Sequence, residues 1–227
     1  YKRQVLENVA AFWEYMLCIQ KNPVRGYGMM LVNVTYDSNA YTSSAVETLK
    51  TLWKTGGRQA IDALLYAMGL VNLTNKQPME GAEATIERLA ELHEQYSGNK
   101  EIALAYAKGQ VNLSAEQPME GAEATVERLA ELYEQYSGNQ EVALVYAKGL
   151  VNLSAEQPME GTEATVERLA ELYEQYSVNQ EIALVYASGL VNLSDRQVVE
   201  EVLETIRHLE KLYCMYPCLL YTSDAAD

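Results

Sequence analysis

The chain has 227 residues, of which 48% are hydrophobic, and its formal net charge is −15. A chain of this length and composition can bury a large core. Its acidity argues against non-specific binding to nucleic-acid phosphates, which needs a basic surface. We interpret the charge as the solvated, Glu-rich surface of a soluble protein.

A segment of about 40 residues recurs along the chain. Residues 140–179 nearly copy residues 100–139, and more divergent copies occupy residues 21–59, 60–99 and 180–217. Residues 1–20 read as a partial unit, the closing helix of a preceding copy, so we expect the sequence to begin within a longer array. Such recurrence predicts a single domain over residues 1–217, in which each unit packs on its neighbours.

Each unit begins with a stretch that is apolar nearly all round. Four small or apolar residues share one face of the predicted helix because they follow the spacing i, i+3, i+4 and i+7: Ala143, Tyr146, Ala147 and Leu150. Val142, Leu144 and Val145 cover much of the rest, so this first helix must be covered on more than one side.

The second half of each unit predicts an amphipathic helix. Its apolar stripe in one unit consists of Val126, Leu129, Ala130, Tyr133 and Tyr136. Glutamates such as Glu127 and Glu131 take the opposite face, which predicts a solvated outer side. No window alternates with period two, so no sheet is expected and the fold class is all-α.

The segment between the two helices carries turn signals. Ser154 and Gln157 have the spacing of a capping box, and Pro158 is then expected in the first turn of the second helix. Asn152 and Ser154 also form an Asn-x-Ser sequence, which we interpret as the end of one helix and the cap of the next rather than as a glycosylation site. Glycines within the first helices, such as Gly149, predict a close approach between units.

These helix pairs resemble tetratricopeptide repeats (TPRs). With Gln140 as the first position, Ala143, Tyr146, Ala147 and Leu150 occupy the family's positions four, seven, eight and eleven. The period of about 40 residues exceeds the family's 34, and we assign the extra length to the turn between the helices. The resemblance implies a right-handed α-solenoid of stacked helix-turn-helix repeats, with a HEAT-like α-solenoid as the alternative.

The resemblance also implies a binding surface. In the family, positions two, five, nine and twelve of each first helix face a concave groove that binds peptides. Carried over to this sequence, these positions predict an apolar track with flanking charges, made of Leu64, Met68, Val71, Leu104, Lys108, Val111, Leu144, Lys148, Val151, Leu184 and Val191. The same positions include Glu101. An alternative is that the Leu and Val side chains only pack between adjacent first helices.

No motif for catalysis, a cofactor or a metal ion is found. The sequence contains no phosphate-binding loop, dinucleotide fingerprint, nucleophile elbow or metal-ligand spacing. His93 replaces a Tyr of later units, which indicates a packing role. We therefore predict a protein that is not an enzyme, needs no cofactor and binds neither nucleic acid nor membranes.

The last ten residues, 218–227, resemble the translation of a transposase adapter used to prepare sequencing libraries. We expect them to be foreign to the natural protein, and the sequence to come from an environmental, microbial source, most simply a bacterium. The function expected is a cytoplasmic protein- or peptide-binding scaffold. Two alternatives remain: a structural array that self-associates through its end repeats, and a regulatory segment of a larger enzyme or signalling protein.

Overall fold

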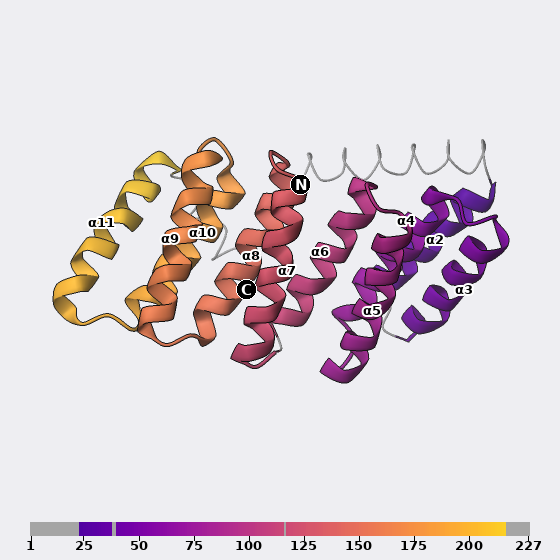
Figure 1. The fold of residues 1–227 in the computed structure, drawn as a ribbon, viewed down its shortest axis with the longest axis horizontal. Coiled ribbons are helices and arrows are strands. Elements are labelled where there is room, and N and C mark those ends of the chain that lie inside the picture. Colours follow the sequence, from indigo (N-terminus) through magenta and orange to yellow (C-terminus); the bar gives the residue numbers. More distant parts are fainter. Residues whose placement is uncertain (1–22, 38–39, 116, 217–227) are drawn as a thin grey trace. The chain divides into compact units, whose positions relative to one another are not determined.

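The structure is a computed structural model, which describes residues 23–37, 40–115 and 117–216 (Figure 1). The partial unit predicted over residues 1–20 and the adapter-like residues 218–227 lie outside the described residues.

The described residues form ten α-helices and no strand, which confirms the all-α fold class. The first helices of the units are α2 (Pro23–Asp37), α4 (Ala60–Thr74), α6 (Lys100–Ser114), α8 (Gln140–Glu156) and α10 (Gln180–Ser194). The second helices are α3 (Thr42–Thr55), α5 (Met79–Gln95), α7 (Met119–Gln135), α9 (Met159–Gln175) and α11 (Val199–Met215).

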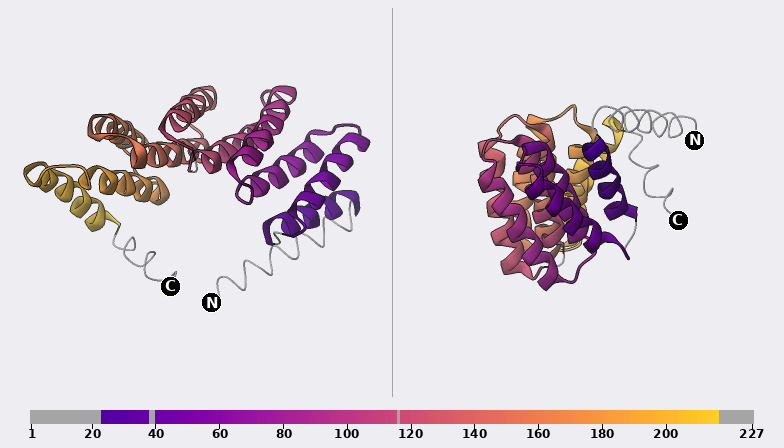
Figure 2. Two further views of the ribbon diagram at one scale, coloured as in Figure 1. Left: turned by 90° about the horizontal axis from the view of Figure 1, so that it is seen from below. Right: turned by 90° about the vertical axis from the view of Figure 1, so that its right-hand side faces the viewer.

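The chain divides into two compact units, residues 1–109 and residues 110–227, with the division inside α6. In the N-terminal unit α2 packs on α3 and α4, and α4 also packs on α3 and α5. In the C-terminal unit α8 packs on α7, α9 and α10, and α10 also packs on α9 and α11. Within each unit, consecutive helices lie alongside each other and are joined by short turns (Figure 2).

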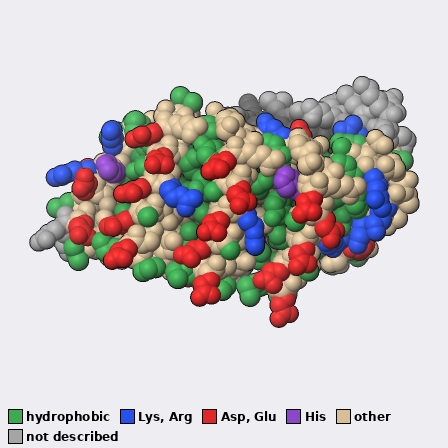
Figure 3. Space-filling model, in the orientation of Figure 1, with side chains coloured by type: hydrophobic (Ala, Val, Ile, Leu, Met, Phe, Trp, Pro, Cys, Tyr) green, Lys and Arg blue, Asp and Glu red, His purple; other side chains and the backbone are tan. Residues whose placement is uncertain are grey.

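This packing explains the two hydrophobic patterns of the sequence. The first helices α4, α8 and α10 each have several helical neighbours, as their all-round apolar pattern predicts. The second helices keep an outer side in solvent, and Glu127, Glu131, Glu167 and Glu171 on that side are exposed. Acidic side chains are accordingly spread over the face shown in Figure 3.

The predicted close approach at the helical glycines is confirmed. A Cβ atom on Gly149 would lie 2.5 Å from Leu129 Cδ1, and one on Gly189 would lie 2.5 Å from Leu169 Cδ1. In both places the glycine of a first helix faces a leucine of the preceding second helix. A side chain at the glycine position would therefore force the two helices to shift.

Aromatic pairs join the same helices. Tyr133 stacks on Tyr146 with ring centroids 5.4 Å apart, and Tyr173 stacks on Tyr186 at the same separation. His93 takes the equivalent place and stacks on Tyr106 at 5.5 Å, so its predicted packing role is confirmed. Burial lowers the pKa of His93, and the nearby Glu94 opposes this shift.

The predicted capping box is wrong. Ser154 lies within α8, and its hydroxyl donates a hydrogen bond to the carbonyl oxygen of Val151 at 2.8 Å. The N-cap of α9 is Pro158, four residues after the predicted cap Ser154, and it makes no side-chain cap. Gln157 instead accepts a hydrogen bond at 2.7 Å from the hydroxyl of Thr165, which links the turn to the second turn of α9.

The extra residues of each 40-residue unit are also not in the turn between its helices, where the sequence predicted them. Helix α4 ends at Thr74 and α5 begins at Met79, so residues 75–78 alone connect them, and Gln157 and Pro158 alone connect α8 to α9. The extra residues relative to the TPR period are therefore not in this turn, because the first helix continues through the Asn-x-Ser/Thr segment.

The asparagines of that segment link adjacent first helices. The side-chain amide of Asn152 donates to the Ser114 hydroxyl at 2.9 Å and to the Val111 carbonyl at 3.2 Å. Asn192 makes the same two bonds to Ser154 and Val151, at 2.8 and 3.3 Å. We call this arrangement, which Asn72 repeats on α2 through Thr35 and Val32, the asparagine ladder. It replaces the predicted role of these residues at the helix ends.

Candidate functional site

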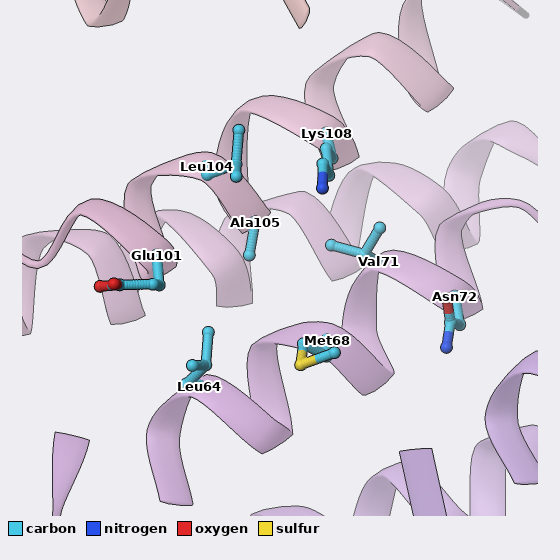
Figure 4. A pocket seen from close by; sticks show the side chains of 8 residues that line it. All are labelled: Leu64, Met68, Val71, Asn72, Glu101, Leu104, Ala105 and Lys108. Atoms are coloured by element: carbon cyan, nitrogen blue, oxygen red, sulfur yellow. The ribbon is translucent and has the colours of Figure 1, made fainter. Parts of the chain in front are cut away.

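A cavity opens between the first helices α4 and α6 in the N-terminal unit. Its volume is about 330 Å³. We call it the α4/α6 groove; its lining residues are Leu64, Met68, Val71 and Asn72 from α4 and Glu101, Leu104, Ala105 and Lys108 from α6. Figure 4 shows side chains from the two helices directed toward the space between them.

The centre of the groove is apolar. Leu64, Val71 and Leu104 are half-buried, and Ala105 is buried between them and the core. Met68 is 43% exposed and lies on the α4 side of the groove. An unbranched thioether adapts its shape to different partners, so Met68 is suited to contact an apolar side chain of a ligand.

Charged and polar groups border this apolar surface. Glu101 and Lys108 are both exposed on α6, two helical turns apart, which corresponds to about 10 Å along the helix axis. They place opposite charges at the two ends of the groove (Figure 4). Asn72 lines the groove while its amide nitrogen is held by Thr35 Oγ1 of α2 at 2.9 Å, so its position is fixed by the asparagine ladder.

Six of the residues at the predicted groove positions therefore line one cavity: Leu64, Met68, Val71, Glu101, Leu104 and Lys108. Asn72 and Ala105, which also line it, were not predicted. They follow a predicted position directly, Val71 in one case and Leu104 in the other. The cavity is wide enough to be lined by side chains from more than one row along each helix. The predicted positions describe only one such row, so they could not indicate Asn72 and Ala105.

The remaining predicted residues lie in the C-terminal unit. Leu144, Lys148 and Val151 are on α8, and Leu184 and Val191 are on α10, which packs on α8. Lys148, Leu184 and Val191 are exposed, whereas Leu144 and Val151 are half-buried. Val111 on α6 points toward α8, where one of its methyl groups would lie 3.9 Å from a Cβ atom on Gly149.

The groove combines an apolar centre with a charged border. Among the described residues no group of three or more His, Cys, Asp or Glu side chains could hold a metal ion. No helix in the described part of the chain has the length and apolar character needed to cross a membrane.

The 40-residue repeat and its helix pairs are the features by which this chain can be compared with known proteins. No protein-family model matches the chain, and no curated protein or solved structure does either.

Proposed function

We propose that this protein is a non-catalytic scaffold that binds a segment of a partner protein in the α4/α6 groove. The observation that carries the proposal is the convergence of Leu64, Met68 and Leu104 on one open apolar cavity. An exposed apolar surface of this kind, bordered by charge, is characteristic of a protein-binding site.

The dimensions of the groove favour a peptide with regularly spaced apolar side chains. An amphipathic helix or an extended segment can place apolar anchors against Leu64, Met68 and Leu104. An acidic group of the ligand would lie at Lys108 and a basic group at Glu101, because opposite charges in these positions fix the orientation of the ligand. We further propose that the units form a TPR-like, right-handed solenoid and that the protein acts in the cytoplasm.

The test is selection from a random peptide display library, followed by measurement of affinity by fluorescence polarisation. Met68→Glu combined with Leu104→Glu should reduce the affinity of the selected peptides by at least about tenfold, because each change places a charge in the apolar centre. Circular dichroism should show unchanged helix content. The matched control is Met79→Glu, since Met79 is similarly exposed but lies at the start of α5, outside the groove. Full affinity in the double variant would refute the assignment.

A second function, self-association, is favoured by α11. Leu203, Ile206 and Tyr213 are exposed on this helix, whereas Val166, the equivalent of Ile206 one unit earlier, is 5% exposed. The mass from light scattering should then rise with protein concentration, and Ile206→Glu should abolish the rise. A constant monomer mass would exclude this function.

A further inference from the structure

An arginine–tyrosine contact recurs in the fold. In the N-terminal unit, Arg88 of α5 donates from Nε to the Tyr66 hydroxyl of α4 at 2.7 Å. The same guanidinium donates to Glu47 Oε1 of α3 at 2.8 Å, and its Cζ lies 5.3 Å from the centroid of the Tyr66 ring. Tyr66 and Glu47 therefore form a binding site for a guanidinium group that the chain itself supplies.

The C-terminal unit repeats the contact between α8 and α9. Arg168 donates to the Tyr146 hydroxyl, and its Cζ lies 5.4 Å from the centroid of the Tyr146 ring. A cavity beside this contact, lined in part by Tyr146 and Arg168, has a volume of about 300 Å³.

In the last 40-residue repeat, which follows the repeat of Tyr146, the two acceptor residues are present but the arginine is not. Tyr186 of α10 and Glu167 of α9 stand at the spacing of Tyr66 and Glu47, and His208 of α11 stands where Arg88 and Arg168 do. Tyr186 is 8% exposed, and its hydroxyl makes no hydrogen bond within the described residues. His208, whose side chain is shorter than that of arginine, is exposed.

A cavity of about 510 Å³ occupies this place, and we call it the α11 cavity. Its lining includes Tyr186, His208 and four glutamates, which are Glu163, Glu167, Glu201 and Glu204. Glu201 and Glu204 take the places of Gly161 and Ala164 in the preceding unit, so negative charge increases where the internal arginine is lost.

The tyrosine is a neutral acceptor. Burial raises the pKa of Tyr186, and Glu174 raises it further. At Tyr146 burial also raises the pKa, but the charge of Arg168 opposes that effect. The hydroxyl of Tyr186 therefore keeps its proton at neutral pH and can accept a hydrogen bond through an oxygen lone pair.

We propose that the α11 cavity binds an arginine side chain of a partner protein. This side chain would take the place that Arg88 and Arg168 occupy in earlier 40-residue repeats. The guanidinium would lie over the Tyr186 ring, donate to the Tyr186 hydroxyl and pair with Glu167, as Arg88 does with Tyr66 and Glu47. The additional carboxylates compensate the charge of a ligand that is not covalently attached. This site lies in the C-terminal unit and is independent of the α4/α6 groove.

The test is an NMR titration of the full chain with arginine blocked at both ends, as Nα-acetyl-arginine amide. Backbone amide signals of α9 and α11 around the cavity should shift, and the equally sized, uncharged citrulline derivative should leave them unchanged. Free arginine should bind more weakly, because its carboxylate meets the four glutamates.

His208→Arg is the decisive variant, because it supplies the internal arginine that the preceding units have. We expect it to weaken binding of the blocked arginine by about tenfold or more while the protein stays folded. Gln135→Arg is the matched control, since it adds the same charge at an exposed position at the end of α7 and should leave binding intact. Tyr186→Phe keeps the ring and removes the acceptor, so it should weaken binding less than His208→Arg.

Three results would overturn the proposal. The first is equal binding by the wild type and His208→Arg. The second is a set of shifted signals scattered over the acidic surface, with none at the cavity. The third is tighter binding of free arginine than of the blocked form, which would indicate a site for the amino acid instead of a protein side chain.

Discussion

The asparagine ladder makes a quantitative prediction for the variant Asn152→Ala. The substitution removes two hydrogen bonds between α8 and α6, to Ser114 Oγ at 2.9 Å and to the Val111 carbonyl at 3.2 Å. Each bond contributes about 1 kcal/mol net, and the Val111 carbonyl still accepts a hydrogen bond from the Ser114 hydroxyl, although Ser114 Oγ no longer accepts the one from Asn152. We therefore expect the free energy of unfolding to fall by about 1–2 kcal/mol.

The assay is urea denaturation followed by circular dichroism, analysed with a nearest-neighbour repeat model. A double-mutant cycle with Ser114→Ala isolates the Asn152–Ser114 bond, and its coupling energy should be about 0.5–1.5 kcal/mol. Lys148→Ala, an exposed change on the same helix, should alter the stability by less than about 0.5 kcal/mol. Zero coupling, together with an Asn152→Ala effect no larger than that of Lys148→Ala, would show that the ladder does not stabilise the fold.

Two further predictions concern packing and pH. Gly149→Ala gains about 1 kcal/mol of helix propensity but places a Cβ atom 2.5 Å from Leu129, which is 1% exposed. Because overpacking costs about 1–3 kcal/mol, urea denaturation should show that the free energy of unfolding falls by up to about 2 kcal/mol. Gly161→Ala should be neutral or stabilising, and equal effects of the two variants would contradict the close approach at Gly149. Burial lowers the pKa of His93, so the unfolded chain takes up a proton before the folded chain does as the pH falls below about 6.5. The free energy of unfolding should therefore decrease on acidification, and it should decrease less steeply in His93→Tyr than in the wild type. Identical pH profiles would exclude His93 as a cause.

The sequence predicted the helices well because their signals are local and repeated. The apolar spacing of Ala143, Tyr146 and Leu150 depends on helix geometry alone, and several copies of it reinforce one another. The same holds for Gly149, since a glycine inside a strongly helical stretch has few roles other than close packing.

The turn could not be read in the same way. Ser154 and Gln157 have the spacing of a capping box, but their partners are elsewhere: Ser154 accepts a bond from Asn192 of the next unit, and Gln157 accepts one from Thr165. A local pattern cannot reveal a partner that folding brings in from another unit. The α11 cavity was missed for a related reason, since it follows from a comparison of His208 with the arginines of earlier units and not from a motif.

The asparagine ladder has a consequence for how such an array can change length. Each unit supplies one donor and one acceptor: the Asn152 amide donates to the preceding unit, and Ser154, two residues later, accepts from Asn192 of the following unit. A whole unit that is duplicated or deleted therefore brings or removes one of each, and the junction closes with the same bonds. Residues 100–139 and 140–179 are nearly identical, so unequal recombination between their coding segments would yield longer or shorter proteins in which every connection is preserved. An insertion within a first helix that is not a whole unit would shift the asparagine relative to its serine or threonine partner.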